Sequence, residues 1–286
     1  MSITLTGSVK ERRHASTMNI DRLSTLDMLK VIHQDDALIS AAITPCLTTI
    51  ARVVDNAAAT LSHGGRLVIV GAGPSGRVAQ QAADEYAPGK TPVIAITAGE
   101  EAGSYERGVA DLQAIKFGEQ DMMLAVTVSG KTPWVWGAMR HAWSLGSVAA
   151  ITDDAQSEAA QLASMVIAPE LGADAIAGYI NTKAGIAQKM ILTMITTGLA
   201  VRTGRVFSNL RVDLDASNTK WSERQIAIVM EAGGCTRSAA KAALESCNHN
   251  CKTAVLMVLT GLDAWKAHEL LAQNNGFIRL ALQEAP

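Results

Sequence analysis

The sequence is poor in charged, aromatic and cysteine residues. Of its 286 residues, 18% are charged and 4% are aromatic, and the formal net charge is −2. The chain therefore lacks the large basic field that would attract nucleic acid or an acidic membrane surface. Its four cysteines do not make a disulfide framework at this length. These shortages argue against nucleic acid, membranes and disulfides as the basis of its function.

The chain also has no long, uninterrupted apolar run. The first 13 residues contain no apolar core of the kind found in signal peptides. The stretch from Ile186 to Val201 is broken by Gln188 and Lys189, so we expect no segment to reach the ~20 apolar residues of a membrane span. These observations predict a cytoplasmic protein. The apolar content of 48%, combined with few charges, also favours a symmetric dimer.

Strand-like and helical patterns alternate in the middle of the chain. Apolar runs predict strands at Leu67–Val70, Pro92–Thr97, Met122–Val128, Ser147–Thr152 and Met165–Ala168. The runs are continuously apolar, which is typical of strands covered on both faces. Helical stretches between several of them predict an α/β fold, a three-layer sandwich around a parallel sheet. Ligands should bind beyond the carboxyl ends of such strands.

Three segments are expected from the patterns. Residues 1–63 hold a polar arm followed by helices, of which the longest runs from Asp36 to His63. Residues 64–221 hold the sheet, and they end with a long buried helix from Thr182 to Thr203 and the segment after it. Residues 222–286 contain only short helical stretches, which predicts a small helical domain.

Two loops rich in glycine and hydroxyl side chains follow predicted strands. The first, Gly71-Ala-Gly-Pro-Ser-Gly76, fits the dinucleotide pattern G-x-G-x-x-G, but Glu100 is poorly placed to serve as its acidic residue. The second is Ser129-Gly-Lys-Thr132. Two such loops suit a phosphate monoester better than a pyrophosphate; nucleotide binding and plain tight turns remain as alternatives. The expected phosphate contacts are Gly73, Ser75, Ser129, Gly130 and Thr132.

Several motifs in order resemble one known family. They are Gly71-Ala-Gly-Pro-Ser-Gly-Arg77, Ser129-Gly-Lys-Thr-Pro-Trp-Val135, Lys183-Ala-Gly-Ile-Ala-Gln-Lys189 and Asn209-Leu-Arg-Val-Asp213. Together they are similar to the N-acetylmuramic acid 6-phosphate etherases, which have a sugar isomerase (SIS) domain and are related to the glucokinase regulatory protein. The resemblance runs from about Lys10 to Leu282 and includes the tail, which looks like the family's small ubiquitin-associated (UBA)-like module.

The resemblance implies a lyase reaction on a phosphorylated amino sugar. In this family, D-lactate is eliminated from C3 of N-acetylmuramic acid 6-phosphate after proton abstraction at C2, during peptidoglycan recycling. A carboxylate with a pKa raised by partial burial can act as both base and acid, and Glu85 matches the family's glutamate. The resemblance also suggests sugar contacts at Glu100 and Lys183, no cofactor or metal, and a homodimer with the site near the subunit interface.

Some positions depart from the family pattern. The family's second catalytic glutamate has no clean match, although Glu106 could replace it. Gly178-Tyr-Ile-Asn181 stands where the family has two hydroxyls and an arginine, Pro74 replaces a threonine, and Glu11-Arg-Arg-His14 differs from the usual motif. Two alternatives therefore stay open: a regulatory protein that binds sugar phosphate without chemistry, and an aldose–ketose isomerase.

In the tail, Cys247-Asn-His-Asn-Cys251 has zinc-ligand residue types at an unusual spacing, which a turn explains better.

Overall fold

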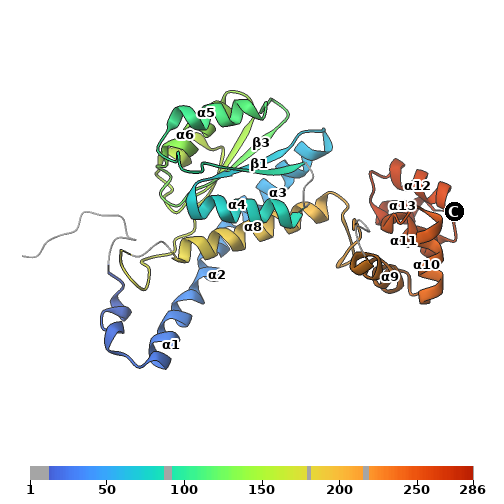
Figure 1. The fold of residues 1–286 in the computed structure, drawn as a ribbon, viewed down its shortest axis with the longest axis horizontal. Helices are drawn as coiled ribbons and strands as arrows, with labels where there is room; N and C mark the ends of the chain where they lie inside the picture. Colours follow the sequence, from blue (N-terminus) through green and yellow to red (C-terminus); the bar gives the residue numbers. More distant parts are fainter. Residues whose placement is uncertain (1–12, 87–91, 179–181, 215–218, 286) are drawn as a thin grey trace, which may run out of the picture. The chain divides into compact units, whose positions relative to one another are not determined.

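The structure is a computed structural model that describes residues 13–86, 92–178, 182–214 and 219–285. The chain divides into two compact units, Met1–Gly198 and Leu199–Pro286. The first unit contains the parallel sheet, and the second contains the helical tail. Figure 1 shows the elements with the labels used below.

A five-stranded parallel sheet forms the centre of the first unit. Its strands are β1 (Leu67–Gly71), β2 (Val93–Thr97), β3 (Met122–Val126), β4 (Ser147–Ile151) and β5 (Met165–Ile167). Their order across the sheet is β2-β1-β3-β4-β5, and all neighbours are parallel. The chain thus moves outward from β1 in one direction and from β3 in the other. In open α/β sheets, ligands bind at such a switch point, between the loops that leave the two central strands.

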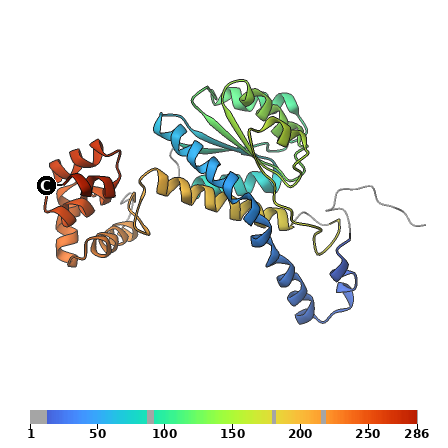
Figure 2. The ribbon, with the colours of Figure 1, turned by 180° about the vertical axis from the view of Figure 1, so that it is seen from behind.

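Helices cover both faces of the sheet, as the apolar strand pattern predicted. One layer contains α5 (Tyr105–Ala114), α6 (Pro133–Trp143) and α7 (Glu158–Leu162). The opposite layer contains α3 (Leu47–Ser62), α4 (Gly73–Tyr86) and α8 (Thr182–Arg202), and both views show this division (Figures 1 and 2). Beneath the first layer, Val70 and Met123 pack with Leu112, Trp134 and Met139 in one buried cluster. The three-layer α/β sandwich predicted from the sequence is confirmed.

The N-terminal elements precede the sheet. They are η2 (Ala15–Thr17), η3 (Ile20–Arg22), α1 (Thr25–Asp36), α2 (Leu38–Ile43) and η4 (Thr44–Cys46). The Ser24 hydroxyl caps α1 by accepting a hydrogen bond from the backbone N–H of Asp27 at 3.2 Å. The single helix expected from Asp36 to His63 is instead divided by η4. Pro45 lies in η4 and has no N–H to continue the helical hydrogen bonds.

The second unit is a helical bundle with a short hairpin. It contains β6 (Val206–Phe207), β7 (Leu210–Arg211), α9 (Thr219–Gly233), α10 (Arg237–Ser246), α11 (Cys251–Thr260), α12 (Ala264–Gln273) and α13 (Ile278–Glu284). The unit starts before the predicted boundary at 221/222. The reason is that Val212 and Leu214, together with Phe207 and Leu210, pack in the tail's own core rather than with the sheet.

Two helical stretches are long and apolar enough to cross a membrane by length and composition alone. They are Thr25–Ser62 and Thr182–Arg202, whereas the sequence led us to expect none of that length. Each contains a buried polar side chain that is bonded inside the first unit: Asp35 contacts Lys183, and Gln188 contacts Ser75. We therefore describe both stretches as helices of a globular unit.

Candidate active site

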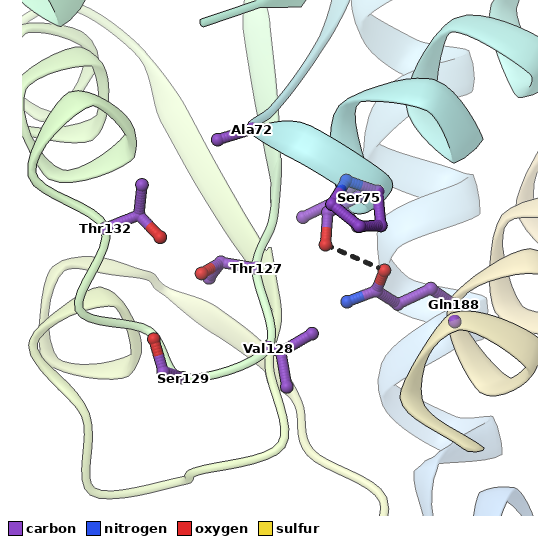
Figure 3. Close-up of a pocket in the computed structure, with 10 residues that line it drawn as sticks. Ala72, Ser75, Thr127, Val128, Ser129, Thr132 and Gln188 are labelled. Atoms are coloured by element: carbon purple, nitrogen blue, oxygen red, sulfur yellow. Dashed lines mark hydrogen bonds between the residues drawn. The ribbon is translucent and has the colours of Figure 1, made fainter. Parts of the chain in front are cut away.

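A pocket lies at the carboxyl ends of β1 and β3. Gly71 and Val126 are opposite each other at the ends of these two strands, so the loops that follow begin side by side. The pocket has a volume of about 230 Å³ and is shown in Figure 3. Its lining residues are Ala72, Pro74, Ser75, Val126, Thr127, Val128, Ser129, Thr132, Gly185 and Gln188. The two hydroxyl-bearing loops identified from the sequence thus meet at one site.

The loop after β1 turns directly into α4. The helix begins at Gly73, which has a φ of +53° that favours glycine. Ser75 consequently lies in the first turn of the helix, rather than in a loop before it. Its side chain lines the pocket and is buried, with 5% relative exposure. The amino-terminal end of α4 therefore presents the positive end of its dipole to the pocket.

The loop after β3 ends at the start of α6. Gly130 has a φ of +68°, and a Cβ atom there would lie 2.1 Å from the Ser157 hydroxyl oxygen, so no larger residue fits. The Ser129 hydroxyl accepts a hydrogen bond from the backbone N–H of Lys131 at 3.2 Å. Thr132 is the N-cap residue of α6, yet its side chain makes no capping hydrogen bond. The Thr132 hydroxyl is therefore available to a ligand, and Figure 3 shows it and Ser129 at the pocket.

Helix α8 contributes a residue that was not proposed from the sequence. Gln188 is buried and lines the pocket, and its Oε1 accepts a hydrogen bond from the Ser75 hydroxyl at 3.0 Å. The sequence showed Gln188 as a polar residue that interrupts an apolar helix and as a member of the motif Lys183-Ala-Gly-Ile-Ala-Gln-Lys189, but neither signal assigned it a role. Such a residue needs a hydrogen-bonding partner in the interior, and the sequence pattern does not show which one.

Glu85, the predicted acid and base, lies at the other end of α4. Ten residues separate it from Ser75, which corresponds to about 15 Å along a helix axis. The side chain is exposed, and it accepts hydrogen bonds from Gln81 Nε2 at 2.9 Å and from Lys189 Nζ at 2.5 Å. Glu85 is not among the residues that line the pocket. Within one chain, Ser75, Ser129 and Thr132 come together at the pocket, whereas the proposed carboxylate does not join them, and Gly73 and Gly130 are not among the lining residues.

The other predicted carboxylates also lie outside the pocket. Glu100 is in the turn after β2, and Glu106 is in the first turn of α5; both are exposed. Strand β2 lies on the side of β1 away from β3. Their roles, as a sugar contact and as a replacement for the second glutamate, remain predictions. Residues 179–181 and residues 11–12 of the altered motifs lie outside the described residues.

Lys183, the second predicted sugar contact, is buried in an ion pair. Its Nζ lies 2.7 Å from Asp35 Oδ1, and it also donates to the carbonyl oxygens of Ala173 at 2.7 Å and Leu171 at 3.3 Å. His14 Nε2 lies 3.2 Å from the same Asp35 oxygen. These contacts use the three hydrogens of the lysine ammonium group. They connect α8 to α1 and to the segment before α8, which indicates a structural role.

We expect the Lys183→Met variant to lose about 3–5 kcal/mol of unfolding free energy, because it leaves the Asp35 carboxylate buried without its main cation. The double variant Lys183→Met/Asp35→Leu should recover most of this loss. Urea denaturation of the single and double variants measures both values. If Lys183→Met instead kept wild-type stability but lost sugar-phosphate affinity, Lys183 would be a ligand contact.

The described residues include no group of three or more His, Cys, Asp or Glu side chains that could hold a metal ion. In the tail, burial raises the pKa of the Cys251 thiol to about 12, with a further contribution from nearby Cys247. The thiol form, which is a poor metal ligand, is therefore favoured at neutral pH. Cys251 is the first residue of α11 and packs in the core of the tail.

No family model matches the chain, but it is similar to known proteins over nearly its full length. It is 46% identical to the N-acetylmuramic acid 6-phosphate etherase of Klebsiella aerogenes, covering 99% of both chains. It is 43% identical to the etherase of Aliivibrio fischeri strain MJ11, covering 99% of this chain and 100% of the relative.

Solved structures with a similar fold have low sequence identity. A Bacteroides fragilis protein, described as a phosphosugar isomerase involved in capsule formation, aligns with a TM-score of 0.55 and 18% identity over 65% of this chain and 95% of that chain. The phosphoheptose isomerase of Neisseria gonorrhoeae aligns with a TM-score of 0.53 and 13% identity over 62% of this chain and 100% of its own. These likenesses support the fold of the sheet-containing part.

Proposed function

The chain belongs to the N-acetylmuramic acid 6-phosphate etherase family, and from this premise we propose that the pocket between the β1 and β3 loops holds the phosphate of the sugar substrate. The chain is a carbon–oxygen lyase of that family. The observation that carries the proposal is the convergence of Ser129, Thr132 and the start of α4 on one pocket at the switch point of the sheet. Hydroxyl donors and a helix amino terminus together form a site for an anion.

The reaction requires a proton to be moved at C2 of the open-chain sugar. A carboxylate removes this proton, the electron pair forms a C2–C3 double bond, and the C3–oxygen bond to lactate breaks. An acid protonates the departing lactate oxygen, and water then adds at C3 while C2 regains a proton. The products are D-lactate and N-acetylglucosamine 6-phosphate. We assign the proton transfer at C2 to Glu85, whose carboxylate is oriented by Gln81 and Lys189.

The separation between the pocket and Glu85 suggests that two copies of the chain share each site. About 15 Å along α4 exceeds the span from the phosphorus to C2 of an open-chain hexose 6-phosphate. We therefore propose a homodimer in which Glu85 of the partner subunit reaches a sugar whose phosphate lies in the pocket. Exposed leucines on the N-terminal helices, among them Leu26, Leu29 and Leu38, supply apolar surface for such contact. Figure 2 shows these helices projecting from the sheet layer.

We also propose that the enzyme is cytoplasmic and that it needs no cofactor. No cofactor is required because the elimination uses only proton transfer and an aldehyde already present in the open-chain sugar. The aldehyde makes the C2 proton acidic enough for a carboxylate to remove.

The phosphate assignment predicts that Ser129→Ala and Thr132→Val each lower kcat/KM for N-acetylmuramic acid 6-phosphate about 10- to 100-fold. The reason is that each variant removes a hydrogen bond to a charged oxygen. A coupled assay of released D-lactate measures the effect. Ser144→Ala, which removes an exposed hydroxyl just past the other end of α6, is the matched control and should behave as wild type. Wild-type kinetics in both pocket variants would contradict the assignment, and tight binding without lactate release by the wild type would support the regulatory alternative.

A further inference from the structure

Gln188 carries a hydrogen-bond donor that the described structure does not use. The side chain has 1% relative exposure and lines the pocket. Its Nε2 atom is buried and has no hydrogen-bond partner among the described residues. An amide N–H left unpaired in the interior destabilises a protein, so such groups are rare without a purpose. The position at the pocket suggests that the donor is completed by a ligand.

The neighbouring serine determines which end of the amide faces the pocket. The Ser75 hydroxyl has a single hydrogen, and it donates this hydrogen to Gln188 Oε1 at 3.0 Å. With Oε1 held by Ser75, Nε2 lies on the side of Val128 and Thr127, as Figure 3 shows. In this arrangement Ser75 has no hydrogen left for an anion. The hydrogen-bond donor that was expected at Ser75 is therefore replaced by the Nε2 group of Gln188.

The composition of the pocket makes this donor important. None of its ten lining residues carries a charge, so a bound dianion is stabilised there by hydroxyl and amide donors and by helix ends. Ser129 and Thr132 supply hydroxyls from the β3 side of the pocket. The corresponding donor on the α8 side is Gln188 Nε2. A phosphate between the two loops would then be contacted from both sides.

We propose that Gln188 Nε2 donates a hydrogen bond to the phosphate of the sugar, and that Ser75 is the residue that positions the amide for this contact. The proposal rests on the proposed phosphate site, and it adds a binding residue from α8 and changes the role expected for Ser75. It also places the contact at the non-reacting end of the sugar. Gln188 should therefore govern affinity for phosphorylated ligands and not for the sugar ring alone.

Two substitutions separate the donor from the rest of the side chain. Gln188→Met keeps the length of the side chain but removes the donor, and it should weaken binding at least about tenfold. Gln188→Glu can still accept from Ser75 but places an anion beside the phosphate, and it should weaken binding at least about a hundredfold. Gln113→Glu, which changes charge at an exposed position on α5, is the matched control and should bind as wild type.

The measurement is calorimetric titration of the full chain with N-acetylglucosamine 6-phosphate and with unphosphorylated N-acetylglucosamine, accompanied by thermal melting of each variant. We expect the wild type to prefer the phosphorylated sugar and the two Gln188 variants to lose that preference. Wild-type affinity in Gln188→Met would overturn the role of Gln188 while leaving the phosphate site intact. If the wild type itself did not prefer the phosphorylated sugar, the proposed phosphate site would be wrong.

A second measurement uses the wild-type chain and so does not depend on the folding of variants. In protein labelled with ¹⁵N-glutamine, one buried side-chain amide should shift downfield on addition of N-acetylglucosamine 6-phosphate, because its N–H forms a new hydrogen bond to a charged oxygen. The unphosphorylated sugar should not cause this shift. Glutamine side-chain signals that respond identically to both sugars would contradict the proposal.

Discussion

Replacing Glu85 with glutamine is expected to reduce lactate release by a factor of about 10²–10⁴, the usual contribution of a positioned general base. Glutamine has the same shape but does not take a proton at neutral pH. Gln81 and Lys189 donate to different oxygens of Glu85, so the single amide oxygen of glutamine can still accept from one of them. Binding of N-acetylglucosamine 6-phosphate should remain close to the wild-type value, since the proposed phosphate pocket lies at the other end of α4.

The control for this variant lies one residue away. Asp84 is exposed on the same helix and accepts a hydrogen bond from Gln80, so Asp84→Asn removes a neighbouring charge without changing Glu85. We expect Asp84→Asn to keep nearly full turnover. If Glu85→Gln kept wild-type turnover, the base would be another residue, and the exposed Glu106 on α5 would be the next to test.

Mixing two inactive variants is expected to restore activity if each site is shared between subunits. Ser129→Asp places a carboxylate in the phosphate pocket, where it repels the dianion, whereas Glu85→Gln leaves the pocket intact. A dimer with one chain of each kind contains one complete site, made from the pocket of the Glu85→Gln chain and Glu85 of the partner subunit. After unfolding and refolding together, an equal mixture should regain about a quarter of the wild-type activity, given random assembly of two-fold dimers.

The reverse combination provides the control. A chain that carries both Glu85→Gln and Ser129→Asp, refolded with wild type, forms mixed dimers that have no complete site under the shared arrangement. Under a single-chain arrangement, the wild-type subunit of each mixed dimer would keep its activity, and the two single variants would fail to complement. If the site is shared, the mixture of single variants gains activity and the mixture of double variant with wild type loses it. If each chain has a complete site, the single variants gain no activity and the wild-type subunits keep theirs.

Much of the fold follows from local pattern. The predicted strands match β1 to β5 to within a few residues, because continuously apolar runs of this length are stable only between two helix layers. The loops after Gly71 and Val126 were identified for a similar reason. Glycines at turns and hydroxyls at strand ends depend on residues nearby along the chain, so the amino-acid sequence alone reveals them.

The sequence pattern did not reveal contacts between segments that are far apart along the chain. Lys183 was predicted as a sugar contact, yet it pairs with Asp35, 148 residues away. Gln188 interrupts an apolar stretch and lies in a family motif, but no site role was predicted for it, and its partner Ser75 is 113 residues away. The expectation of a partly buried Glu85 also differs from its exposed position at the end of α4. In each case, the environment of the side chain depends on which helix packs beside it, and periodicity does not encode that pairing.

The most direct test is a crystal structure of the Glu85→Gln variant with N-acetylmuramic acid 6-phosphate bound. We predict that the phosphate lies between the β1 and β3 loops, within hydrogen-bonding distance of Ser129, Thr132 and Gln188, and that C2 of the sugar faces residue 85 of the partner subunit. A phosphate bound elsewhere, with this pocket empty and residue 85 of both subunits turned away from the sugar, would contradict the account.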